Sequence, residues 1–176
     1  MIYLSTNLGA KRLNLLRDLV PQATTVAFLT IAREARGEPE DRAPGASAQE
    51  RDILAAAQAL GRQLIVLEVR SSGEIEAAFS TLVERGARAL VVGVSPFLMA
   101  NSDKIQALAA HHMIPAIYPF RQYALKGGLM SYGGDTREAY RQAGVYVGRI
   151  LKGAKPADLP VQLSTRFEFV IIARRS

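Results

Sequence analysis

Short runs of apolar, often β-branched residues alternate with amphipathic segments along almost the whole chain, and this alternation constrains the fold most. Strands that are apolar at nearly every position are typical of a parallel sheet with helices on both faces. We therefore predict an α/β fold, a Rossmann-like or flavodoxin-like three-layer sandwich whose five-stranded parallel sheet has the order 2-1-3-4-5. The five expected strands are Thr24–Thr30, Gln63–Val69, Ala89–Val94, Pro115–Tyr118 and Leu129–Tyr132.

Helices are expected between these strands, with capping pairs at three of the helix starts. The pairs are Ser47 with Glu50, Ser71 with Glu74, and Asp135 with Glu138. Residues 1–155 are interpreted as one lobe, and residues 156–176 as a C-terminal linker followed by a terminal strand, Phe167–Ala173. The segment Ile31–Ala46 is charged and contains Gly and Pro, so we expect it to be a mobile loop. The expected helices are Leu8–Val20, Ser47–Leu60, the segment after Ser71 up to Gly86, Ser102–His112, Arg121–Leu125 and the segment from Asp135 to Gly153.

Composition and missing motifs exclude several kinds of chemistry. The chain contains no cysteine, which rules out disulfides, thiol nucleophiles and zinc sites built from cysteine. No dinucleotide-binding or P-loop motif follows a predicted strand, so we expect no cofactor and no enzyme activity. His111 and His112 are adjacent and would point about 100° apart on a helix, so we expect no metal site. The net charge is +6, but the basic residues are scattered, so we expect no nucleic-acid partner.

Polar and aromatic residues gather where the predicted strands end. In a sheet of this order, ligands bind at the carboxyl ends of the strands, near the point where the strand order reverses. Hydroxyls, aromatic rings and one arginine at this edge suit a small-molecule ligand, and the arginine could pair with a carboxylate. Ordinary loop packing and helix capping would explain the same residues. The candidate ligand-binding residues are Thr30, Ser95, Pro96, Phe97, Tyr118, Phe120, Arg121, Ser131, Tyr132 and Gly133.

Three long stretches carry a resemblance to a known family. They are AAFSTLVERGARALVVGVSPF, IQALAAHHMIPAIYPFRQYALKGGLMSYG and AYRQAGVYVGRILKGAKPADLPV. They resemble the substrate-binding proteins of ABC transporters, including the tryptophan- and tyrosine-type uptake proteins, over about Leu4 to Ile171. The resemblance covers only the second lobe of that family, a periplasmic-binding-protein-like type I lobe. It implies binding residues at Ser95–Phe97, at Tyr118 and Arg121, and at Ser131–Gly133.

The sequence departs from the family in places. Thr30 and Ile31 stand where the family usually has Asn-Pro after the first strand, and the loop that follows is longer and more charged. The chain ends shortly after Phe169–Ile171, where family members continue into a closing helix.

The resemblance implies a ligand-binding lobe of an ABC solute-binding protein, with an amino acid or a similar small organic solute as ligand. An ABC permease would be the partner of a complete binding protein, and the family is periplasmic. The start of the sequence lacks a signal-peptide pattern, so the chain as written would be cytoplasmic. A cytoplasmic effector-binding or regulatory module is therefore the alternative. The apolar terminal segments Ile2–Leu4 and Phe167–Ile172 also lead us to expect a homodimer or larger assembly, unless the tail folds back onto its own sheet.

Overall fold

The computed structural model describes residues 8–32, 48–160 and 166–172, and these residues form a six-stranded sheet in the order β2-β1-β3-β4-β5-β6. The first five strands are parallel, which confirms the predicted fold and order, whereas β6 is antiparallel to β5 and adds a sixth strand at the edge. The strands are β1 (Thr25–Ile31), β2 (Gln63–Val69), β3 (Ala89–Val92), β4 (Ala116–Tyr118), β5 (Met130–Gly134) and β6 (Phe167–Ile171).

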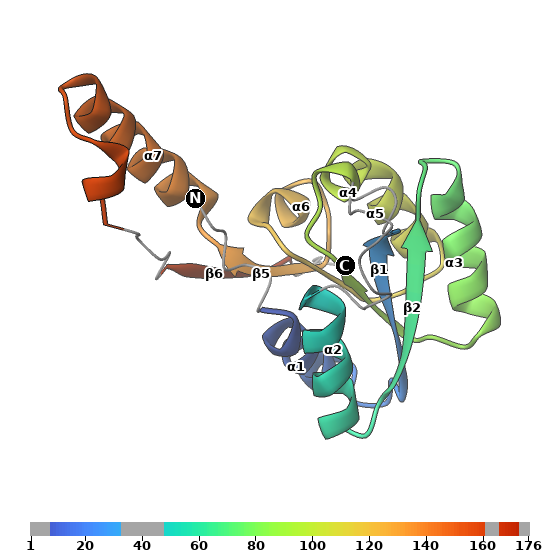
Figure 1. Cartoon of the computed structure of the whole chain (residues 1–176). Coiled ribbons are helices and arrows are strands. Elements are labelled where there is room, and N and C mark those ends of the chain that lie inside the picture. Colours follow the sequence, from blue (N-terminus) through green and yellow to red (C-terminus); the bar gives the residue numbers. More distant parts are fainter. Residues whose placement is uncertain (1–7, 33–47, 161–165, 173–176) are drawn as a thin grey trace, which may run out of the picture.

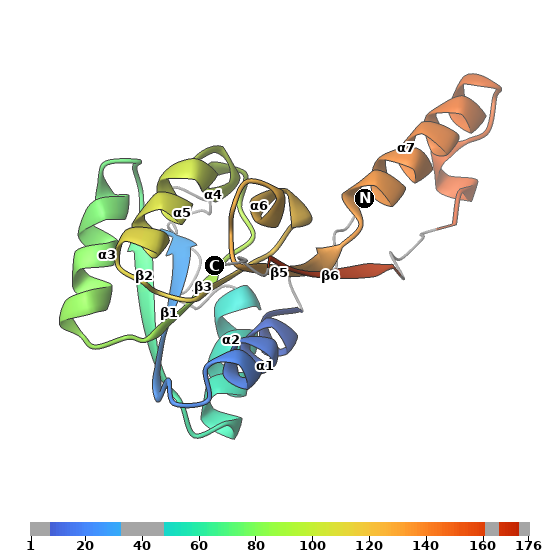
Figure 2. The ribbon, with the colours of Figure 1, turned by 180° about the vertical axis from the view of Figure 1, so that it is seen from behind.

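Helices cover both faces of the sheet and make the three layers (Figures 1 and 2). On one face α1 (Gly9–Leu19) and α2 (Ala48–Ala59) pack over a core that includes Leu13, Phe28 and Ile53. The other core includes Phe79, Leu90 and Tyr118 and lies under the remaining helices of the body. These are α3 (Glu74–Glu84), α4 (Pro96–Ala100), α5 (Ser102–His111) and α6 (Arg121–Leu125).

The burial of the strands follows from their place in the sheet. The central strand β1 lies between β2 and β3, and its five middle residues are all buried. The edge strand β2 alternates, with Ile65, Leu67 and Val69 buried and Val66 and Glu68 exposed. The alternation predicts which side of an edge strand packs against the core, and the fully apolar run predicts a strand covered on both faces.

Several predicted element ends differ from the structure. The helix α4 was not predicted, because five residues are too few to show a helical period; Ser95 caps it and Pro96 begins it. The Ser71–Glu74 capping box is wrong: α3 follows Gly73, and the Glu74 carboxylate accepts a hydrogen bond from the Arg70 backbone N–H at 3.0 Å. Ser47 and most of the predicted loop Ile31–Ala46 lie outside the described residues.

After β5 the chain leaves the body of the lobe and returns to it in β6. The excursion consists of α7 (Thr136–Leu151), which projects away from the sheet in Figures 1 and 2, and the short helix η3 (Pro156–Asp158). Asp135 caps α7 as predicted, by accepting from the Arg137 N–H at 2.9 Å, whereas Glu138 pairs with Arg141 instead of completing a capping box.

The tail folds back onto its own sheet, because β6 pairs with β5 from Met130 opposite Ile171 to Gly134 opposite Phe167. This pairing removes the open edge of β5 that supported the expectation of self-association. Apolar side chains remain half exposed on β6, and α7 carries others. The division of the chain near residue 155 stays a prediction.

Candidate functional site

Because β1 and β3–β5 are parallel, their carboxyl-terminal ends lie along one side of the sheet, called here the carboxyl edge. The predicted site segments lie at or directly after these strand ends. Thr30 lies near the end of β1, Ser95–Phe97 follow β3, and Tyr118 pairs with Ser131 across β4 and β5. The fold therefore places at this edge the segments that the sequence singled out. Their side chains differ in how far they are accessible.

The turn between β3 and α4 is held by side-chain hydrogen bonds. The Ser95 hydroxyl accepts from the backbone N–H groups of Phe97 at 3.1 Å and Leu98 at 3.5 Å, which fixes the start of α4. The Gln49 side-chain amide pairs with both backbone groups of Val94, at 2.7 and 3.0 Å. Sequence reasoning missed Gln49, because nothing in its local pattern points to a partner on another element. Thr30 is buried, Pro96 is exposed and Phe97 is half-buried.

The last residue of β4, Tyr118, was predicted to bind a ligand but lies in the core. The Tyr118 ring is 1% exposed and stacks on the ring of Tyr123 in α6, with centroids 4.8 Å apart. Burial raises the pKa of both phenols, so both stay protonated at neutral pH. The Tyr118 side chain thus packs beneath this part of the site. The half-buried Phe120, two residues later, lies nearer the surface.

The end of β5 is held close to its neighbours. A Cβ on Gly133 would lie 1.8 Å from the carbonyl oxygen of Pro119, so only glycine permits this approach. Arg12 of α1 donates through Nε to the Tyr132 carbonyl at 2.8 Å, and its side chain is buried. Desolvation lowers the pKa of Arg12 to about 10, an effect opposed by Asp52 and Tyr132. Sequence reasoning missed Arg12, which lies on the buried face of α1 beside Leu13 and Leu16.

Ser131 is also buried, and its hydroxyl has no hydrogen-bond partner among the described residues. Tyr132 is half-buried and its ring lies near Phe167 and Phe169 of β6. The three residues Ser131–Gly133 therefore contribute a buried hydroxyl, a half-covered ring and a tightly packed backbone.

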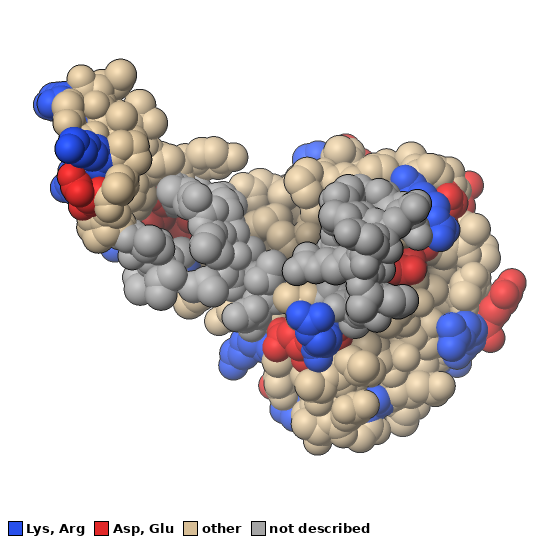
Figure 3. All heavy atoms as spheres, in the orientation of Figure 1, with Lys and Arg blue, Asp and Glu red and all other residues tan. Residues whose placement is uncertain are grey.

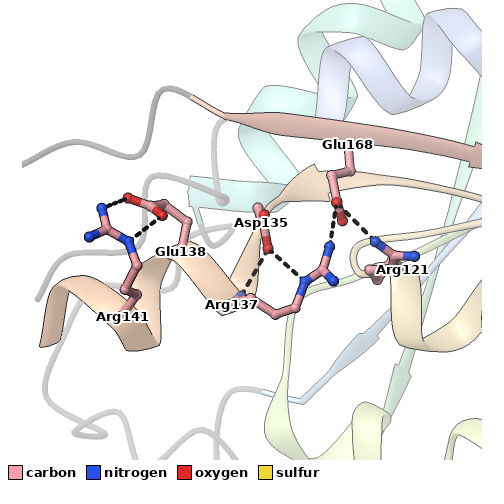
Figure 4. A network of polar contacts seen from close by, with 6 residues as sticks. All are labelled: Arg121, Asp135, Arg137, Glu138, Arg141 and Glu168. Carbon is pink, nitrogen blue, oxygen red and sulfur yellow. Dashed lines mark hydrogen bonds and ion pairs between the residues drawn. The ribbon is translucent and has the colours of Figure 1, made fainter. Parts of the chain in front are cut away.

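A polar network crosses from this edge to β6 and α7 (Figure 4). Arg121, predicted as the partner of a ligand carboxylate, donates to Glu168 with its Nη1 at 3.0 Å from Oε1. The same oxygen is 3.2 Å from Nη2 of Arg137, and Nε of Arg137 lies 3.6 Å from Oδ1 of Asp135. Sequence reasoning missed Glu168, because the contact depends on β6 returning to the sheet.

The surface carries charges of both signs. On the face in Figure 3, Lys and Arg side chains are interspersed with Asp and Glu. Within the described ranges 8–32, 48–160 and 166–172, no three His, Asp or Glu side chains form a group that could hold a metal ion. None of the helices in those ranges has the length and apolar character needed to span a bilayer.

Comparison with known proteins decides the family. The family model described as "ABC transporter substrate binding protein" matches residues 6–174. The chain belongs to this family. The family is one of substrate-binding proteins, which agrees with the expectation of a binding protein rather than an enzyme. No curated protein matches the chain.

Several longer solved structures share the fold of this ABC substrate-binding family member. An ABC domain from Streptococcus pneumoniae in complex with L-Trp superposes with a TM-score of 0.75 at 21% identity, over 93% of this chain and 53% of that one. A conserved domain protein from Vibrio cholerae gives a TM-score of 0.76 at 18% identity, over 93% and 52%. A LacI family transcriptional regulator from Arthrobacter, in complex with lactose, gives 0.62 at 16% identity, over 94% and 63%. The chain thus spans about half the length of the first two, and the likeness concerns the fold.

Proposed function

We propose that this chain is a ligand-binding lobe of an ABC solute-binding protein, and that its ligand is an amino acid or a similar small organic solute. The observation that carries the proposal is the set of four strand ends at one edge of the sheet, in a chain that belongs to a substrate-binding family. The S. pneumoniae structure of the same fold holds L-Trp, which makes amino acids the first class to test.

The proposed site uses the accessible residues of that edge. Phe97 and Phe120 are half-buried and offer apolar contact to a ligand body. Arg121 is 30% exposed at its side chain and offers a guanidinium to a carboxylate. Thr30, Ser95, Tyr118 and Ser131 are buried and would act mainly by shaping the edge. Pro96, Tyr132 and Gly133 complete the proposed set.

The alternative, a cytoplasmic effector-binding module, uses the same fold. The similarity to the LacI-type regulator supports only the architecture, whereas the family match supports solute uptake. For uptake, the partner would be an ABC permease and the location periplasmic. Permease and ATPase genes next to the gene for this chain would support uptake, and a gene for a DNA-binding partner in their place would support regulation.

The ligand proposal is tested by thermal unfolding of the purified chain with each of the twenty standard amino acids. A ligand at 100 times its Kd stabilises the folded state by about 2.7 kcal/mol, which is a measurable rise in Tm. Phe120→Ala should weaken that rise, and Leu125→Ala, at the exposed other end of α6, is the matched control. If none of the amino acids raises the Tm, the proposal of an amino-acid ligand is wrong.

We also propose that the chain forms a homodimer through α7. The side chains of Tyr140, Val147 and Leu151 share one face of this helix and are 75%, 55% and 83% exposed. On β6, Phe167, Phe169 and Ile171 are half-exposed and add apolar surface. The exposed apolar residues of the chain are therefore grouped on α7 and β6 rather than scattered singly. We propose that a second copy of the chain covers this apolar face of α7. In a two-fold symmetric dimer, the two α7 faces would bury each other.

Light scattering coupled to size exclusion tests the assembly. We expect a dimer that Leu151→Glu dissociates, while Val145→Glu, which lies on the opposite side of α7, leaves it intact. A monomer mass near 19.1 kDa at all micromolar concentrations would contradict the homodimer.

A further inference from the structure

Glu168 joins three elements through one carboxylate oxygen. Its Oε1 lies 3.0 Å from Arg121 of α6 and 3.2 Å from Arg137 of α7, while Glu168 itself belongs to β6 (Figure 4). Charge-assisted hydrogen bonds of this length are among the stronger polar contacts in proteins. Two guanidinium groups therefore share the Glu168 carboxylate at the place where the lobe continues into α7.

The backbone brings this counter-ion to the edge that holds the proposed site. Glu168 is opposite Gly133 in the β5–β6 register. The close approach of Gly133 to the Pro119 carbonyl holds β5, and β6 with it, against the segment that begins α6. Arg121 is the first residue of α6, so its guanidinium meets Glu168 directly after β4 ends.

The arrangement allows exchange. The side chains of Arg121 and Glu168 are 30% and 25% exposed, so water and a ligand carboxylate can reach the pair. If Glu168 leaves Arg121, it still has Arg137 as a partner, so its charge is not left unpaired. Arg137 in turn keeps Asp135, whose Oδ1 also accepts from the Arg137 backbone N–H at 2.9 Å. Losing the contact to Arg121 therefore leaves the Glu168 carboxylate paired with Arg137.

We propose that Glu168 is a specificity-determining counter-ion, which holds Arg121 in the ligand-free lobe and is exchanged for the carboxylate of an amino-acid ligand. This inference rests on the proposed function. The exchange makes binding a competition between two carboxylates for one guanidinium. Glu168 thereby lowers the affinity for every ligand that binds through a carboxylate, relative to ligands that lack this group.

The experiment measures the affinities of the twenty standard amino acids and of their α-carboxamides, by thermal shift and calorimetry, for the wild-type chain and three variants. Glu168→Gln keeps an oxygen acceptor beside Arg121 but removes the competing charge. We expect it to bind the amino acids about tenfold more tightly, with the affinities for the amides unchanged. Arg121→Gln should bind each acid and its amide equally.

Glu138→Gln is the matched control, because Glu138 pairs with Arg141 at 2.6 Å on the same helix as Arg137 and makes the same kind of ion pair. It should bind acids and amides as the wild type does. Circular dichroism confirms that each variant is folded before its affinities are compared.

The outcomes separate this inference from the function on which it rests. If amino acids bind and Glu168→Gln leaves their affinities unchanged or weakens them, the exchange is wrong and the proposed function stands. An equal gain in Glu138→Gln would also refute the exchange, because the effect would then be one of overall charge. If no amino acid binds any form of the chain, the proposed amino-acid ligand fails and the exchange fails with it.

Discussion

Replacing Gly133 by alanine tests the packing that holds the end of β5. The added Cβ would lie 1.8 Å from the Pro119 carbonyl oxygen, and the nearest atoms are backbone rather than the tip of a flexible side chain. To reach an ordinary contact of about 3.5 Å, β5 and the segment after β4 must separate by more than 1 Å. Overpacking of a well-ordered interior usually costs about 1–3 kcal/mol, and a clash between two backbones belongs at the upper end.

We therefore expect Gly133→Ala to lower the free energy of unfolding by about 3 kcal/mol. With a urea m-value of about 2 kcal/mol/M, the midpoint of unfolding should fall by about 1.5 M. Gly148→Ala is the matched control, since a Cβ there meets no atom within 4 Å and the residue lies inside α7. That change should stabilise the helix by about 0.5–1 kcal/mol. Equal midpoints for Gly133→Ala and the wild type would refute the close-approach argument.

Three further changes probe other parts of the fold. Met113→Asn should stabilise the chain by about 1 kcal/mol in urea unfolding, because Met113 has a φ of 53° and is 86% exposed, and asparagine tolerates this conformation; a loss of stability would contradict this. Gln49→Leu should cost about 1–3 kcal/mol in the same assay, since it leaves both backbone groups of Val94 without their partner; an unchanged midpoint would show that water replaces the amide. Hydrogen bonds from Arg141 and then Gln142 lower the pKa of Glu138 to about 2, so their support of α7 is complete above the ordinary carboxyl pKa of 4.5 and should be lost as the pH falls towards 2; an NMR titration of Glu138 with a midpoint near 4.5 would refute it.

The strand order was predicted from the regular alternation of strands and helices, and the burial of two of the strands agrees with it. The apolar run at Thr25–Ile31 marks a central strand, and the alternation in Gln63–Val69 is that of the edge strand β2. The place of the candidate site then follows from the parallel order alone. Helix α4 could not be predicted in this way, because its start depends on the hydroxyl of Ser95 and its five residues show no period.

The contacts that shape the site are different in kind. Arg12 has an ordinary helical neighbourhood in the sequence, yet it is buried and donates to Tyr132, 120 positions away. Glu168 meets Arg121 only because β6 pairs with β5. Tyr118 was expected to contact a ligand, but it is buried and its ring stacks on Tyr123 of α6. Such contacts are set by tertiary packing, which local periodicity and propensity do not report.

The return of β6 also bears on how the chain reaches its native state. β5 and β6 form a hairpin whose connection, residues 135–166, includes the whole of α7. For a chain segment of that length, closure costs roughly 2 kcal/mol more entropy than for a two-residue turn, since each doubling adds about 0.6 kcal/mol. The connection from β1 to β2, residues 32–62, is about as long, but the other crossovers among β1–β5 are shorter. Since β6 pairs with β5 alone, we expect β6 to dock last. Until β6 docks, β5 is an open edge on which the β6 of a neighbouring chain competes with the molecule's own, so refolding at high concentration should favour strand-exchanged dimers.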